Sequence, residues 1–262
     1  MEADTTPQPL APVDYNRVQH QGYAQGRALP ADAIQRYMNV FGAHLPAVRP
    51  LVGVDLGSGT GRFTPALAGA FGGPVYGVEP ADGMRDAAEA GSRHPRVSYR
   101  AGRAEAIPLP DAIADFVLMF LSWHHVTDKP AGAREILRVL KPGGRLILRS
   151  TFKDRIPDHW WRSYFPRSHD IEVAMFASEA ETRALFEGAG FRTLASVRME
   201  IPFKGDIAAL VARLKLRAVS VFEHMTGEEL DEGFARIDAD LAAGTIVEKS
   251  TYGDFVVFEA PQ

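Results

Sequence analysis

The chain of 262 residues contains no cysteine. This absence excludes disulfide bonds, thiolate nucleophiles and zinc sites built on sulfur, and it fits a reducing compartment. No apolar run approaches the length needed to cross a bilayer, and the first residues, MEADTTPQPLAPVD, are acidic and proline-containing rather than basic and then apolar. We therefore expect a cytoplasmic protein without a membrane partner, and a disordered segment over residues 1–13.

A large charge imbalance is also lacking, because 29 Lys and Arg stand against 33 Asp and Glu, for a formal net charge of -4. Nucleic-acid binding draws on a concentrated basic face, so this balance argues against a nucleic-acid partner. No carboxylate-rich cluster of the kind that chelates magnesium stands out, and we expect no metal. With 46% hydrophobic and 24% charged residues, the composition is typical of one globular domain. We expect a small-molecule substrate and a monomer or homodimer.

One stretch, residues 51–62 with the sequence LVGVDLGSGTGR, organises the rest of the chain. Its apolar, β-branched run reaches Asp55 and is followed by glycines at alternate positions, the pattern of a buried parallel strand that turns into a helix. Glycine lets a backbone approach a ligand closely, and a helix N-terminus offers unpaired N–H groups. Arg62 stands where the dinucleotide fingerprint G-x-G-x-x-G needs its last glycine, so diphosphate binding is disfavoured. On this stretch alone, a turn without a ligand is the alternative.

Further strands follow at regular intervals. The run PVYGVEP ends in Glu79, at the tip of a second strand, where α/β nucleotide folds hold a ribose with an acidic side chain. Met84 is placed to lie against an adenine or to pack in the core. A third strand covers residues 95–101, and a fourth, DFVLMFLSWHHV, turns polar at Ser122. Open α/β sheets place their chemistry at such carboxyl ends of strands.

The acidic residue followed by x-G-x-G-x-G resembles the first motif of the class I methyltransferases that use S-adenosylmethionine. L-K-P-G-G-x-L at residues 140–146 and F-x-x-A-G-F at residues 186–191 are similar to further phrases of that family. We expect residues 141–144 to form a tight turn, followed by a strand over residues 145–150. The resemblance implies an α/β, Rossmann-like, seven-stranded mixed sheet with strand order 3-2-1-4-5-7-6 and the last strand antiparallel. Helices on both faces and helical lid elements complete this fold. It implies one methyltransferase domain over residues 14–262, with an N-terminal lid at 14–48 and lid or insert segments at 152–177 and 205–244.

The resemblance also implies S-adenosylmethionine as the cofactor. In the family the glycine backbone wraps the methionine part, the acid of the first motif reads its charged end, and the acid of the second strand holds the ribose. Where the family commonly has an aspartate near the adenine, this chain has Arg103, so Ala104 would contact the cofactor mainly through its backbone. Carried onto this sequence, the cofactor-binding residues are Tyr23, Arg27, Asp55, Gly57, Ser58, Gly59, Glu79, Pro80, Met84, Arg103, Ala104, Glu105 and Leu121.

Family members with a histidine as general base imply that His124 is catalytic and His125 structural; a non-catalytic His124 is the alternative. The aspartate that partners this histidine in some members is replaced here by Ser150. Residues 152–177 are rich in aromatic side chains, which can enclose a planar substrate or surround a sulfonium cation. The substrate-binding candidates are Tyr15, Trp123, Trp160, Trp161, Tyr164 and Phe222, with His224 and Met225 as weaker ones, and core packing is the alternative for each.

We therefore expect methyl transfer to an aromatic or heteroaromatic small molecule, in secondary metabolism. C-methylation of an indole- or phenol-like ring and O-methylation both fit the sequence. The alternatives are a non-catalytic S-adenosylmethionine-binding regulator and an NAD-dependent oxidoreductase, of which the glycine spacing disfavours the second.

Overall fold

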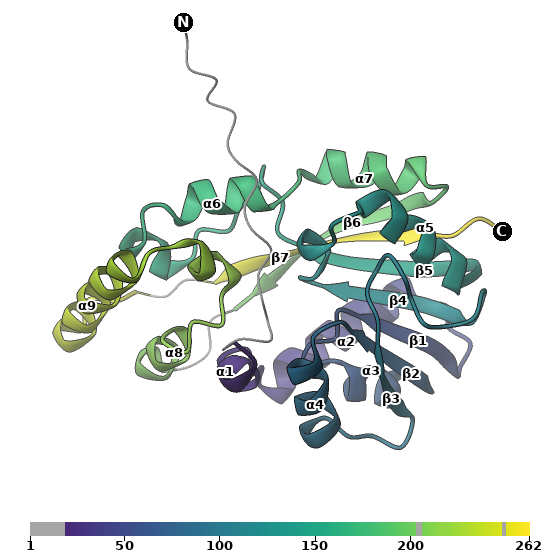
Figure 1. The fold of residues 1–262 in the computed structure, drawn as a ribbon, viewed down its shortest axis with the longest axis horizontal. Helices are drawn as coiled ribbons and strands as arrows, with labels where there is room; N and C mark the ends of the chain where they lie inside the picture. The colour runs from purple at the N-terminus through teal and green to yellow at the C-terminus, as the bar shows by residue number, and fades with distance from the viewer. Residues whose placement is uncertain (1–18, 203–205, 248–249) are drawn as a thin grey trace, which may run out of the picture.

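A seven-stranded sheet lies at the centre of the computed structural model, which describes residues 19–202, 206–247 and 250–262 (Figure 1). Its strand order is β3-β2-β1-β4-β5-β7-β6. Strands β1 to β5 pair in parallel, and β7 runs antiparallel to both of its neighbours. The predicted fold is therefore confirmed. The strands are β1 Leu51–Leu56, β2 Gly72–Glu79, β3 Val97–Ala101, β4 Ala114–Phe120, β5 Leu140–Ser150, β6 Arg192–Ile201 and β7 Thr251–Glu259.

Strand β1 holds the middle of the parallel part, between β2 and β4. Asp55 of β1 is opposite Gly77 of β2 and Leu118 of β4, so the ends of these three strands lie close together. The chain proceeds from β1 to β3 on one side and from β4 onward on the other. This reversal of direction at β1 and β4 is the place where open α/β sheets bind ligands.

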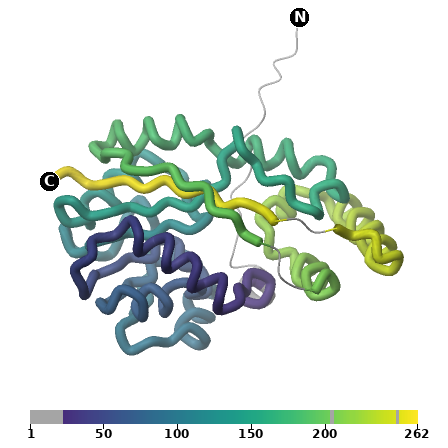
Figure 2. The backbone as a smooth tube through the Cα atoms, turned by 180° about the vertical axis from the view of Figure 1, so that it is seen from behind, coloured from purple at the N-terminus to yellow at the C-terminus, as the bar shows by residue number. Residues whose placement is uncertain are grey.

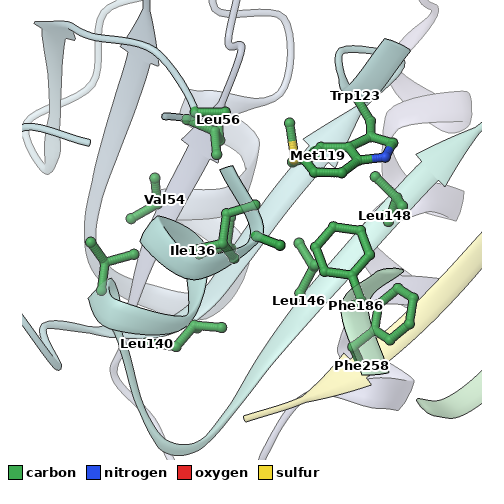
Figure 3. Packing of buried hydrophobic residues seen from close by; sticks show 14 of the residues in the cluster. Val54, Leu56, Met119, Trp123, Ile136, Leu140, Leu146, Leu148, Phe186 and Phe258 are labelled. Carbon is green, nitrogen blue, oxygen red and sulfur yellow. The ribbon is translucent and has the colours of Figure 1, made fainter. Parts of the chain in front are cut away.

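Helices cover both faces of the sheet. On one face, α2 Ala31–His44 and α3 Thr64–Phe71 bury Tyr37, Phe41 and Leu67 in one apolar cluster. On the other, α5 Lys129–Val139 and α7 Glu179–Gly188 bury Ile136 and Phe186 in a second cluster, shown in Figure 3. Helix α4 Asp82–Gly91 lies along β2 and β3. The sheet is thus shielded from water on both sides, as its parallel strands require.

The remaining helices lie beyond the sheet, past one end of its strands (Figures 1 and 2). They have their own apolar cluster, the outer cluster, which contains Trp161, Tyr164, Phe165, Phe222 and Phe234. The segments that build it follow β5 and β6, and they fall within the predicted inserts at 152–177 and 205–244. They are the 3-10 helices η2 Trp160–Tyr164 and η3 Ser220–His224 and the helices α6 Ser168–Met175, α8 Ile207–Leu214 and α9 Gly227–Ala243.

Helix α1 Gln19–Gly26 connects the outer helices with the sheet domain, because it contacts both α8 and α4. It belongs to the predicted N-terminal lid at 14–48. The predicted disordered segment, residues 1–13, lies outside the described residues. None of the described helices combines the length and the apolar character that crossing a membrane demands.

The predicted tight turn at residues 141–144 and the predicted strand at 145–150 both lie within strand β5. Leu140 pairs with Ala114, and regular pairing resumes where Arg145 is opposite Phe116, so the extra residues form an irregularity within the strand. Gly143 has a φ of 72°, and its N–H donates to the carbonyl of Pro261. A glycine suits this positive φ. The irregularity leaves the N–H of Gly143 without a partner in β4, and the carbonyl of Pro261 accepts its hydrogen bond instead.

Candidate cofactor and acceptor site

The glycine turn after β1 has a backbone that other residues would strain. Gly57, Gly59 and Gly61 have φ values of 73°, 53° and 77°. A Cβ atom on Gly57 would lie 2.5 Å from Cβ of Ser122, which follows β4. The turn is therefore pressed against the neighbouring strand end, and only glycine fits there.

Glu79 faces this turn from the end of β2. Its Oε2 atom accepts a hydrogen bond from the N–H of Gly59 at 2.9 Å, and Oε1 accepts one from the N–H of Ala81 at 3.0 Å. Burial raises the pKa of its carboxyl, and these two hydrogen bonds act in the opposite direction. The carboxylate is thus held in one orientation at the edge of a cavity.

This cavity, the first pocket, has an empty volume of about 710 Å³. Its wall brings together most of the predicted cofactor residues from five separate stretches of chain. They are Tyr23, Gly57, Gly59, Glu79, Pro80, Met84, Arg103, Ala104, Glu105 and Leu121. The wall also contains residues that the sequence did not single out for this role, among them Met119, Phe120, Ser122, His125 and Val126.

Three predicted cofactor residues lie outside this wall. Asp55 is 3% exposed and accepts a hydrogen bond from Oγ1 of Thr64 at 2.7 Å, so it fastens the start of α3 beneath the turn. Burial raises the pKa of Asp55 to about 6. Ser58 is buried. Arg27 lines a different cavity, described below. These three do not line the first pocket, and their role in cofactor binding stays a prediction.

Glu105 also has a structural task at the rim of the first pocket. Its Oε1 atom accepts hydrogen bonds from the N–H groups of Thr127 and Asp128, at 3.0 and 3.2 Å. These residues follow the histidine pair after Val126. Glu105 therefore fixes the backbone that presents the histidines.

The two histidines lie on a single 3-10 turn, Trp123–His125, with ring centroids 3.8 Å apart. His125, not His124, lines the first pocket. The ring of His124 lies 4.8 Å from that of Phe176, and both of its nitrogens are buried without a hydrogen-bond partner among the described residues. We expected His125 to be purely structural, but its side chain also lines the first pocket.

Both imidazoles are held in the neutral form. Burial lowers the pKa of His125 to about 4, with His224, Arg27 and Lys129 acting in the same direction. The pKa of His124 is lowered well below its usual value by burial and by the charge of His125, Arg27 and Lys129. At neutral pH each ring therefore has a lone pair that can accept a proton.

A second pocket, with an empty volume of about 900 Å³, lies between the end of α1, helix α8 and the start of η2. Trp160 and Trp161, predicted to bind substrate, both line it, together with Arg27 and Arg62. The two pockets share a wall. The guanidinium carbon of Arg62 lies 5.0 Å from the ring centroid of Phe120, and that of Arg27 lies 5.9 Å from the ring of Tyr23. Both of these rings line the first pocket.

Trp123 corrects the sequence prediction, because it packs in the core. It is 3% exposed, and its ring centroid lies 4.7 Å from that of Phe186 on α7. Figure 3 shows it beside Met119 within the apolar cluster. Residues just past a strand end can face either the cavity or the core, and this indole faces the core.

Tyr164 and Phe222 likewise line neither pocket and belong to the outer cluster. The hydroxyl of Tyr164 donates to Oδ2 of Asp240 on α9 at 2.7 Å, and Phe222 packs between Phe165 and Phe234. They hold the outer helices together rather than contact a ligand in either pocket. Tyr15 lies outside the described residues.

Arg62 and His159 are second-pocket residues that sequence reasoning did not select. The only feature of the sequence that could have pointed to Arg62 is its position directly after the glycine turn. His159 precedes the two tryptophans, and its ring stacks on that of Trp161 at 5.6 Å and 12°. Within the described residues, no group of three or more His, Asp or Glu side chains is arranged to hold a metal ion.

Comparison with known proteins agrees with this geometry. Residues 54–148 match the family model described as a methyltransferase domain. The chain is 30% identical over 171 residues to the ubiquinone/menaquinone biosynthesis C-methyltransferase UbiE of Geobacter sulfurreducens. That alignment covers 54% of this chain and 65% of the relative, so the chain spans less than two thirds of the relative's length.

Two solved structures share the fold. A protein of Anabaena variabilis described as a methyltransferase from an antibiotic biosynthesis pathway has a TM-score of 0.74 at 24% identity, over 90% of this chain and 99% of that chain. The cyclase SpnF has a TM-score of 0.60 at 20% identity, over 90% of this chain and 85% of that chain. At these identities the likeness concerns the fold alone.

The match to the methyltransferase-domain model over residues 54–148 includes the glycine turn, Glu79 and the histidine pair. The class I methyltransferases, which this part of the chain resembles, use S-adenosylmethionine as their cofactor. The first pocket fits it, because the glycines leave room for close approach and Glu79 offers a fixed carboxylate to a ribose. Met84, Met119 and Leu121 supply an apolar wall for a base, with two polarizable sulfur atoms.

Proposed function

We propose that the protein is an S-adenosylmethionine-dependent methyltransferase that acts on an aromatic or heteroaromatic small molecule. The observation that supports this most is the pairing of two adjoining cavities, one with a glycine turn and Glu79, the other with Trp160 and Trp161. The fold alone does not decide the reaction, since a cyclase shares it.

When bound, the cofactor supplies an electrophilic methyl group on a sulfonium sulfur. The chain must then hold the acceptor in line with this methyl group, exclude water and, for a hydroxyl acceptor, remove a proton. Glu79 and the backbone of Gly57 and Gly59 hold the cofactor. The outer helices with Trp160 and Trp161 cover the acceptor.

The histidine pair is the source of the base. His124 has both nitrogens buried and unpartnered among the described residues, and His125 lines the first pocket. A neutral imidazole at this place accepts the proton of an acceptor hydroxyl, as O-methylation requires. C-methylation of an electron-rich ring needs less assistance from a base, and the same aromatic walls suit it.

The decisive experiment has two parts. Calorimetry with S-adenosylmethionine and S-adenosylhomocysteine should show binding of both, and NAD should show none. Incubation of the protein with a cofactor labelled in the methyl group and a panel of phenols and indoles should then transfer the label. NMR of the product distinguishes carbon from oxygen methylation.

Two results would argue for something else. A protein that binds the cofactor but transfers its methyl group to no acceptor in the panel is the regulator described above. A protein that binds NAD in its place is an oxidoreductase. Secondary metabolism as the setting is part of this proposal, and the antibiotic-pathway origin given for the Anabaena variabilis neighbour serves only to guide the choice of panel.

A further inference from the structure

The second pocket has an excess of positive charge. Arg27, Arg62, Arg213 and His159 line it, and none of its lining residues is acidic. Among the described residues, no carboxylate lies within 4.0 Å of any of these three arginines. Arg162, which follows Trp161 in the chain, has the carboxylate partner that a buried arginine usually has, because it forms an ion pair with Glu172 at 2.5 Å. Among the residues that the structure describes, the three arginines of this pocket thus have no carboxylate partner of the kind that buried arginines normally have.

The guanidinium groups are nevertheless held in place. Nη1 of Arg62 donates to the carbonyl of Arg27 at 3.0 Å, and its guanidinium lies over the rings of Phe63 and Phe120, each at 5.0 Å. Nη1 of Arg213 donates to the carbonyl of Ala28 at 3.2 Å. Carbonyl groups and rings fix these side chains and leave other N–H groups available for a ligand.

Two polar atoms at the pocket remain unpaired. Nε of Arg27 and Oγ1 of Thr251 are buried and have no hydrogen-bond partner among the described residues. Burying donors without partners costs about 1–3 kcal/mol each, so such groups usually serve a ligand or water. Asp55 acts on the charge of Arg62 from beneath the glycine turn, but it does not line the pocket.

On the basis of the proposed function, we infer that the methyl acceptor is an aromatic carboxylate, bound in the second pocket by Arg62 and Arg27. The two-pronged geometry of guanidinium matches a carboxylate, and the rings of Trp160 and Trp161 provide an apolar wall for the ring of the acceptor. Because Arg62 lies against Phe120 of the first pocket, an acid held there is anchored beside the cofactor.

The test compares acids with their neutral amides on protein saturated with S-adenosylhomocysteine. Calorimetry measures the binding of salicylate and indoleacetate against salicylamide and indoleacetamide. We expect each acid to bind about tenfold tighter than its amide or more, which corresponds to about 1.4 kcal/mol. R62Q should reduce this ratio to near one while S-adenosylhomocysteine still binds with unchanged affinity, and R27Q should reduce the ratio as well.

R134Q is the matched control, because Arg134 is exposed on α5 at the other face of the sheet. It should keep the full preference for acids. R213Q, at a more exposed position of the same pocket, provides a second variant should R62Q fail to fold, and it should reduce the preference too.

Several outcomes would overturn the inference: acids and amides that bind equally, acids that do not bind, or a preference that survives R62Q, R27Q and R213Q. Loss of S-adenosylhomocysteine binding in R27Q would show that this arginine holds the cofactor instead. Failure of the wild-type protein to bind S-adenosylhomocysteine would overturn the proposed function, whereas cofactor binding without a preference for acids removes this inference alone.

Discussion

Glu79 and Gly59 are joined across two strands: the carboxylate at the end of β2 accepts a hydrogen bond from the backbone N–H in the turn after β1, at 2.9 Å. The other carboxylate oxygen is fixed by Ala81. Both oxygens of the Glu79 carboxylate are therefore positioned before a ligand binds. A pre-positioned acceptor binds ribose hydroxyls without the cost of ordering its side chain.

Glu79→Gln should weaken the binding of S-adenosylhomocysteine about ten- to hundredfold. An amide cannot accept from the ribose and from both backbone N–H groups as a carboxylate does. Calorimetry measures the affinity, and thermal unfolding checks that the variant is folded. Glu89→Gln, an exposed change on α4, should have wild-type affinity. Equal affinity of all three proteins would remove Glu79 from the cofactor site.

Gly57→Ala should lower the free energy of unfolding by about 2 kcal/mol or more and weaken cofactor binding. The new Cβ would lie 2.5 Å from that of Ser122, at a φ of 73°. Gly69→Ala is the control, because this glycine is exposed in α3 and a Cβ there meets no atom within 4 Å. It should stabilise the protein by about 0.5–1 kcal/mol. Urea unfolding measures both changes, and a Gly57→Ala protein as stable as wild type would contradict the strain described here.

His124→Ala or His125→Ala should reduce kcat by about two to four powers of ten, according to which ring is the base, without loss of cofactor affinity. The low pKa of the base adds a second signature. Since the pKa of His125 is about 4, kcat/KM should stay flat from about pH 8 down to about pH 5, where an ordinary histidine would already be protonated. Steady-state rates for both variants across this range test the assignment. Two fully active variants would leave the reaction without a histidine base.

His159→Gln should change how stability depends on pH. Burial lowers the pKa of His159 to about 4, so the unfolded chain binds a proton that the folded one refuses between about pH 6.5 and pH 4. Wild type should therefore lose stability relative to the variant as the pH falls through this window, by on the order of 3 kcal/mol in total. Urea unfolding of both proteins at several pH values measures the difference. A constant difference would show that His159 titrates normally.

Tyr164→Phe should cost about 1 kcal/mol of stability, because it removes the hydrogen bond to Asp240 at 2.7 Å and leaves the ring in the outer cluster. Cofactor affinity should stay as in wild type, since neither residue lines the first pocket. Urea unfolding and calorimetry measure the two quantities. A large loss of cofactor affinity would mean that the outer helices and the first pocket are coupled.

The sheet and the first pocket could be predicted from sequence because their signals are local. An apolar run that ends in alternating glycines defines β1 and its turn, and the next strand end places Glu79 opposite. Parallel strands bring such ends to one edge, so separate local patterns determine one site. The predicted turn at residues 141–144 is instead an irregularity inside β5, because Leu140 already pairs with β4 before the glycines.

Side-chain direction and long-range contacts were harder to predict. Adjacent residues on a 3-10 turn point to different sides, and only packing decides that His125 reaches the first pocket while Trp123 enters the core. Arg62 and His159 meet at one cavity although nearly a hundred residues separate them in the chain. Their encounter depends on where the outer helices settle, and no local pattern records it.

The outer cluster has its own aromatic core, apart from the two clusters that cover the sheet. Exchanging residues 152–177 and 206–243 as one unit with those of another protein of this fold would therefore keep that core intact in the donated part. Chimeras of this kind could acquire a new acceptor while they inherit the cofactor machinery unchanged, which makes the chain a scaffold for recombination.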